Sequence, residues 1–116
     1  ERVDPGSQRF VVSLLPRIAA KLCAQGENAL KRHELVNASA AFERARRIDP
    51  EAWQPRWGLA LVDAERQDWD VATYRLQEAI ERGLEDPDRI LREPLLETYR
   101  ARPEFRQVET LIQKKR

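Results

Sequence analysis

Small and apolar side chains recur along this sequence after 34 residues. The matched positions are Ala38 and Ala72, Phe42 and Leu76, Ala45 and Ala79, and Leu35 and Trp69. A fixed period of this length is typical of stacked copies of one supersecondary unit, each too small to bury its apolar face alone. The sequence therefore predicts a repeat architecture, whose function resides in the surface that the stack presents.

The first copy carries a recognisable set of residues at fixed spacing. They are Gly26, Ala38, Phe42, Ala45 and Pro50. This set resembles the glycine, alanine, aromatic, alanine and proline positions of the tetratricopeptide repeat (TPR), a pair of antiparallel helices. The resemblance covers residues 16–86 well, whereas residues 87–116 fit only as a degenerate copy or a cap.

The second copy, residues 53–86, keeps most of this pattern and departs from it at three positions. Ala60 replaces the usual glycine, Leu76 replaces the aromatic residue, and Leu84 stands where proline is usual. The first exchange keeps a small residue and the second keeps an apolar one. The departures therefore weaken the resemblance only slightly.

The resemblance implies an all-α fold: a right-handed superhelix (α-solenoid) of antiparallel helix pairs, with an N-terminal helical extension and a C-terminal helical cap. We expect one domain over residues 1–116, since a chain of this length can bury one modest core. Its predicted parts are the extension at 1–15, the first repeat at 16–52, the second repeat at 53–86, and the degenerate repeat or cap at 87–116.

Proline, glycine and N-cap residues predict where the helices begin and end. Residues 1–6 are predicted to form a frayed end or turn. Pro16 predicts a break or kink because proline lacks a backbone donor, and Asn37 predicts a helix start because asparagine caps helices well. In the helix after Pro16, Ile18 is expected on the buried face. The predicted helices span 16–31, 37–48, 54–66, 70–82, 88–93, 95–101 and 104–114.

Composition narrows the classes of partner. The formal net charge is +1, so no global field draws the protein to nucleic acid or to an acidic membrane. No apolar run approaches the length of about 18 residues needed to span a bilayer. The sequence contains no methionine, so we expect a processed product or a part of a longer protein. The sequence leaves open whether the protein is cytoplasmic or periplasmic, and whether it forms a homo-oligomer.

The sequence contains only weak candidates for catalytic or metal-binding residues. His33-Glu34 begins a zinc-hydrolase-like string, but Asn37 stands where the second histidine is required. Cys23 is the one cysteine, and among apolar neighbours it is expected to behave as a small hydrophobic residue. We therefore expect no catalytic residues, no bound metal, no cofactor and no enzymatic activity.

The resemblance places the candidate site on the concave face, which the first helix of each repeat lines. The predicted partner-binding residues are Cys23, Glu27, Leu30, Lys31, Gln54, Trp57, Leu61, Glu65 and Leu91. Trp57 is the expected anchor because tryptophan is favoured at interface hot spots. By contrast, Trp69 is expected in the core. The Lys, Asn and Arg clamp with which chaperone-binding members hold a terminal carboxylate is absent from the matching positions.

The expected function is that of a non-catalytic scaffold or adaptor domain that binds a peptide or partner protein segment. Two alternatives stay open. The groove could be filled by the chain's own apolar segment at residues 10–15 or by its C-terminal helix, which would make the domain a structural or self-associating module. The domain could also be an accessory part of a larger enzyme or regulator.

Overall fold

The computed structural model describes the backbone of residues 5–116 and the side chains of residues 14–116. Residues 1–4 of the predicted N-terminal turn lie outside the described residues, as do the side chains at positions 5–13 of the predicted extension. All the regular structure within the described chain is helical, as predicted. The elements are α1 (Pro5–Lys31), α2 (Leu35–Ile48), α3 (Gln54–Glu65), α4 (Trp69–Glu81), α5 (Arg89–Arg92), the 3₁₀ helix η1 (Pro94–Leu96), α6 (Glu97–Arg100) and α7 (Phe105–Lys114).

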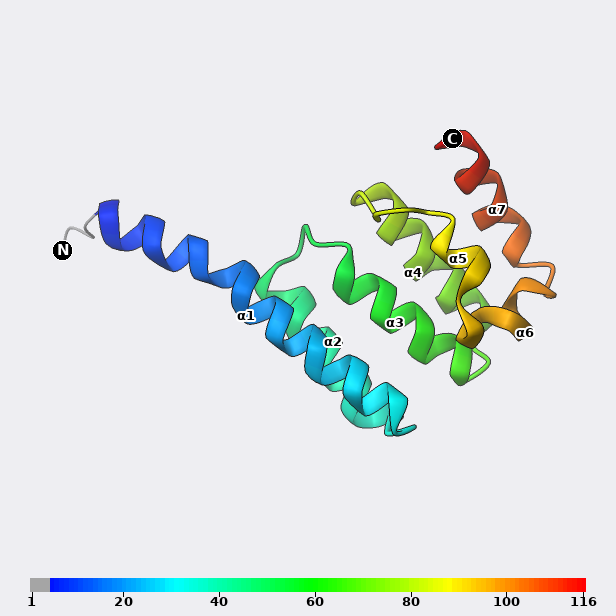
Figure 1. Cartoon of the computed structure of the whole chain (residues 1–116), viewed down its shortest axis with the longest axis horizontal. Coiled ribbons are helices and arrows are strands. Elements are labelled where there is room, and N and C mark those ends of the chain that lie inside the picture. Colours follow the sequence, from blue (N-terminus) through cyan, green and yellow to red (C-terminus); the bar gives the residue numbers. More distant parts are fainter. Residues whose placement is uncertain (1–4) are drawn as a thin grey trace.

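The long helices pack in sequential pairs. Helix α1 packs against α2, α3 packs against α4, and α2 packs against α3, so that the two pairs form adjoining layers (Figure 1). Helix α7 packs against α4, and η1 packs against α3. The C-terminal helices therefore cover the second pair, where the sequence places a cap.

Small side chains allow the close approach of the four long helices. Ala38, Ala45, Ala72 and Ala79 are fully buried, and Phe42 lies between the two pairs with 1% of its surface exposed. A Cβ atom added at Gly26 would lie 2.7 Å from the Phe42 ring, and one added at Gly58 would lie closer still. The predicted repeat residues thus form the core that joins the pairs.

The predicted break at Pro16 is wrong. Helix α1 runs through this residue without interruption, and Figure 1 shows it as one long helix. Pro16 is exposed, so water can hydrogen bond to the carbonyl group that the proline leaves without a donor. A single missing donor can be tolerated in such a position.

The N-terminal part of α1 also differs from the expectation in its packing. Figure 1 shows that α1 extends past α2 and away from the other helices. With 44% of its surface exposed, Ile18 is not in the core, contrary to the predicted buried face. The reason is the direction of the side chain, because the next residue, Ala19, is buried in line with Cys23, Gly26 and Leu30, and Ile18 lies to one side of this buried face.

The predicted helix start at Asn37 is two residues late. Helix α2 begins at Leu35, and Glu34 occupies the N-cap position without a side-chain capping bond. The Asn37 amide instead donates to the Glu34 carboxylate at 3.3 Å. Helices α3 and α4 begin and end within one residue of the prediction, and Gly83, at φ +93°, ends α4 in the left-handed conformation.

Candidate functional site

A shallow groove runs along one side of α1 and α3. It consists of two hollows, which share Glu27. The Cys23 hollow, of about 260 Å³, is lined by Pro16, Ala19, Ala20, Cys23, Ala24, Glu27, Asp49, Ala52, Gln54 and Pro55. The Trp57 hollow, of about 460 Å³, is lined by Glu27, Leu30, Lys31, His33, Trp57, Leu61, Glu93, Pro94 and Leu95. We call the two together the α1–α3 groove.

Three elements build the Trp57 hollow. Helix α1 supplies Leu30, α3 supplies Trp57 and Leu61, and η1 supplies Leu95. Residues 57 and 61 are one helical turn apart, so their side chains lie on the same face of α3. The result is an apolar surface bounded by charged side chains, which is the usual composition of a binding site for a protein segment.

Most of the predicted partner-binding residues meet in this groove. Seven of the nine line one hollow or both: Cys23, Glu27, Leu30, Lys31, Gln54, Trp57 and Leu61. Of these, Cys23, Leu30 and Leu61 are buried and contribute mainly the walls and floor. Glu27, Lys31 and Gln54 are exposed, and Trp57 is half-buried.

The remaining two predicted residues lie elsewhere. Glu65 lies beside the groove, where its carboxylate approaches Nδ1 of His33 at 3.6 Å. Leu91, on α5, has 36% of its surface exposed and lines neither hollow. The short α5 and the turn into η1 carry Leu95, rather than Leu91, to the Trp57 hollow.

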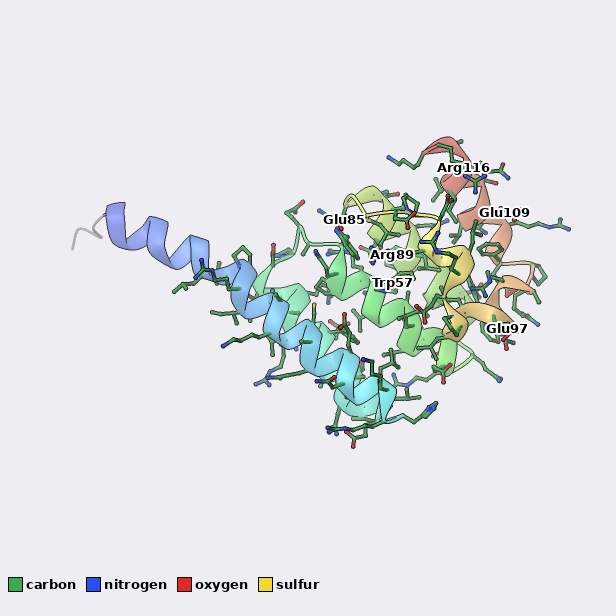
Figure 2. All side chains as sticks on the ribbon, viewed as in Figure 1. Trp57, Glu85, Arg89, Glu97, Glu109 and Arg116 are labelled. Carbon is green, nitrogen blue, oxygen red and sulfur yellow. The ribbon has the colours of Figure 1, made fainter. Side chains whose placement is uncertain are left out.

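Trp57 is less free than an exposed anchor would be. The guanidinium group of Arg89, from α5, lies 4.7 Å from the ring centre of Trp53 and 5.8 Å from that of Trp57. Figure 2 labels Arg89 and Trp57 on adjacent elements of the molecule. Such cation–π contacts hold the indole in place and cover part of it.

The lining residues that were not singled out from the sequence as site residues include Asp49, His33, Glu93 and Pro94. Pro94 was used only to divide the C-terminal helices, and Asp49 only to mark the end of the first copy. His33 was assigned to the surface, where it does lie with 73% of its side chain exposed. Glu93 carried no signal, since the third wall of the groove depends on a turn that the repeat pattern does not describe.

The Cys23 thiol is not activated in this setting. Burial, and then the negative charges of Glu27 and Asp49, raise its pKa to about 11. The thiol therefore stays protonated near neutral pH, and a thiol is a poor nucleophile in that form. Residues 14–116 also contain no group of three His, Cys, Asp or Glu side chains arranged to hold a metal ion.

No helix among the described residues has both the length and the hydropathy that crossing a bilayer requires, as predicted. Comparison with family models, curated proteins and solved structures returns no match to this chain. What can be inferred about function therefore comes from the residue pattern and from the groove itself.

Proposed function

We propose that this chain is a TPR-like interaction domain, which binds a segment of a partner protein in the α1–α3 groove. The observation that carries this proposal is the Trp57 hollow, an open apolar surface that Trp57, Leu30, Leu61 and Leu95 line together with charged side chains. Exposed apolar surfaces rimmed by polar residues mark sites of interaction with proteins or other ligands. The domain acts as a non-catalytic scaffold or adaptor.

The packing of the helices supports the superhelical part of the proposal. Two sequential helix pairs adjoin through α2 and α3, and three of the four pairs of residues that repeat after 34 positions are buried, all except Leu35 and Trp69, which are half-buried. In stacked repeats of this kind, successive first helices line one common face. Here α1 and α3 are those helices, and the groove runs between them.

A pull-down with matched variants tests the proposal. The wild-type domain, Trp57→Ala and the control Tyr74→Ala are used as baits, since Tyr74 is an aromatic residue on α4 with 57% of its surface exposed. We expect a partner that is retained by the wild type and by Tyr74→Ala, but lost with Trp57→Ala. Circular dichroism establishes beforehand that each bait is folded.

A second variant keeps the test decisive if Trp57→Ala destabilises the fold. Glu27→Trp replaces an exposed side chain that the two hollows share, so it obstructs the groove without removing a packed group. Loss of the same partner supports the groove as the binding site. Retention of the same partners by all baits would contradict the proposal, and recovery of the domain's own copy alone would favour self-association.

A further inference from the structure

The rim of the α1–α3 groove carries an excess of negative charge. Three carboxylates line it, those of Glu27, Asp49 and Glu93, against the single ammonium group of Lys31. Three negative charges and one positive charge give −2 for the lining, and the two nearest further charges, Glu65 beside His33 and Arg89 over Trp57, cancel each other. The whole chain has a formal charge of +1, so the negative charge is a local property of this surface.

These carboxylates come from three separate parts of the fold. Glu27 lies on α1, Asp49 directly follows α2, and Glu93 directly precedes η1. The ion pairs among residues 14–116 involve other carboxylates, and none of them includes Glu27, Asp49 or Glu93. No arginine or lysine side chain that the structure describes therefore forms an ion pair with them, and Glu93 instead accepts a hydrogen bond from the backbone N–H of Leu95 at 3.4 Å.

From this arrangement, and resting on the proposed function, we infer that the α1–α3 groove binds a protein segment whose apolar side chains are flanked by lysine or arginine. Leu30, Trp57, Leu61 and Leu95 would receive the apolar side chains, and the rim carboxylates would pair with the flanking cations. Charge complementarity of this kind mainly selects the partner and accelerates its association. An acidic segment or a free C-terminal carboxylate meets a net negative lining, in which Lys31 is the one cationic side chain, and Arg89 is held against the tryptophan rings.

Short synthetic peptides provide the probe. Their leucine-rich centre is held constant, and it is flanked by arginines, by glutamates or by serines. Binding to the wild-type domain is measured by fluorescence anisotropy at low and at high salt. We expect the arginine-flanked peptides to bind most tightly, and we expect high salt to reduce that advantage, because exposed charge pairs are screened.

Two triple variants provide the decisive comparison. Each removes three negative charges, one variant at the groove and the other elsewhere on the surface. The groove variant combines Glu27→Gln, Asp49→Asn and Glu93→Gln, which keep the size of each side chain. The control variant combines Glu85→Gln, Glu97→Gln and Glu109→Gln, three exposed carboxylates that line neither hollow and are labelled in Figure 2. Both variants gain three units of positive charge, so a general effect of net charge changes both equally.

We expect the groove variant to bind the arginine-flanked peptides at least about tenfold more weakly, since exposed pairs contribute up to about 1 kcal/mol each. The control variant should lose less than about twofold. A preference for glutamate- or serine-flanked peptides that Trp57→Ala abolishes would overturn this inference and leave the proposed function standing. Absence of binding by every peptide class would contradict both.

The mass of the domain in solution shows whether the bound segment comes from a second copy of this chain or from a separate protein. We expect the wild-type domain to sediment as one chain. A mass of two chains that falls to one in the groove variant would place a second copy in the groove and would overturn the inference of a separate partner.

Discussion

At the scale of single residues, the position of Phe42 decides how the two helix pairs meet. Its ring is confined by Gly26 on α1 and Gly58 on α3. The repeat pattern identified Gly26 and Phe42, and it assigned the matching small position of the second copy to Ala60. Ala60 is indeed buried, but Gly58 makes the close approach, since the ring of Phe42 crosses from the first pair to the second.

Gly58→Ala should therefore destabilise the domain, although alanine is the better helix former. The gain in helix propensity is about 0.5–1 kcal/mol, whereas overpacking of a filled core costs about 1–3 kcal/mol. We expect a lower free energy of unfolding in urea denaturation. Adding Phe42→Leu should make the combined loss smaller than the sum of the single losses, because the shorter side chain makes room for the added methyl group. Additive losses would contradict this role of Phe42.

Arg89 is a second residue whose role follows from its contacts and not from the sequence pattern. Its guanidinium group lies over Trp53 and Trp57, and its buried Nε has no hydrogen-bond partner among the described residues. The neighbouring Arg92 is exposed and forms an ion pair with Asp86. Two arginines three positions apart therefore differ in what they stabilise.

We expect Arg89→Ala to lower the free energy of unfolding by about 0.5–2 kcal/mol, the range of cation–π contacts. Arg92→Ala should change it by less than about 1 kcal/mol, as is usual for exposed ion pairs. Thermal denaturation, followed by tryptophan fluorescence, reports both stability and the indole environment. Equal effects of the two substitutions would show that the contacts of Arg89 with the tryptophans do not contribute.

At the scale of elements, a group of charged side chains joins α2, α3 and α4. The Arg75 guanidinium group lies 3.3 Å from the Glu43 carboxylate, 3.8 Å from that of Asp63 and 3.8 Å from that of Glu78. The buried Arg56 lies 3.5 Å from Glu78. Three carboxylates thus share two guanidinium groups. Burial raises the pKa of Asp63 from 3.8 to about 6, although the positive charge of Arg75 opposes this shift.

This raised pKa predicts the sign of a pH effect. Because the folded state holds the Asp63 proton more tightly than the unfolded state does, the stabilisation is complete below pH 3.8 and is lost as the pH rises through about 6. The loss is at most about 3 kcal/mol. Asp63→Asn should remove this step in urea denaturation curves measured from acid to neutral pH, and should leave the domain more stable than the wild type above pH 6. Glu81→Gln, on an exposed residue of α4, serves as the control and should retain the step.

The helix boundaries show which features of the fold could be predicted from the sequence. Repeat spacing, Pro55 and Gly83 predicted α3 and α4 to within one residue, since caps and prolines act locally. The continuity of α1 through Pro16 could not be predicted in this way, because the cost of one missing hydrogen bond competes with the helical preference of both flanks. Local rules do not settle that balance.

At the scale of the whole molecule, the groove is only partly contained in the repeat. Two walls, α1 and α3, follow from the first helices of successive copies, which is why Leu30, Trp57 and Leu61 were predicted together. The third wall comes from η1 in the non-repeating region, where Pro94 and Leu95 line the hollow and the predicted Leu91 does not. Without a third helix pair of regular length, the direction of that wall could not be derived from spacing.

The C-terminal helices complete the molecule through a small polar and aromatic cluster. Tyr99 is fully buried, its hydroxyl lies 2.6 Å from Oγ1 of Thr73, and its ring stacks on Trp69 at 6.2 Å. Trp69 is half-buried and packs against the core, where the sequence placed it. This cluster joins the cap to α4 and fixes the elements that carry η1 to the groove.

Photo-crosslinking from inside the groove tests the central claim most directly. Lys31 is replaced by p-benzoylphenylalanine in one variant and Tyr74 in another, since both side chains are exposed and only Lys31 lines the Trp57 hollow. We expect the residue-31 probe to crosslink to one protein, this crosslink to be lost when Trp57→Ala is added, and the residue-74 probe to give none. Crosslinking to the same protein from residue 74 alone, or no crosslink from residue 31 at all, would contradict binding in the groove.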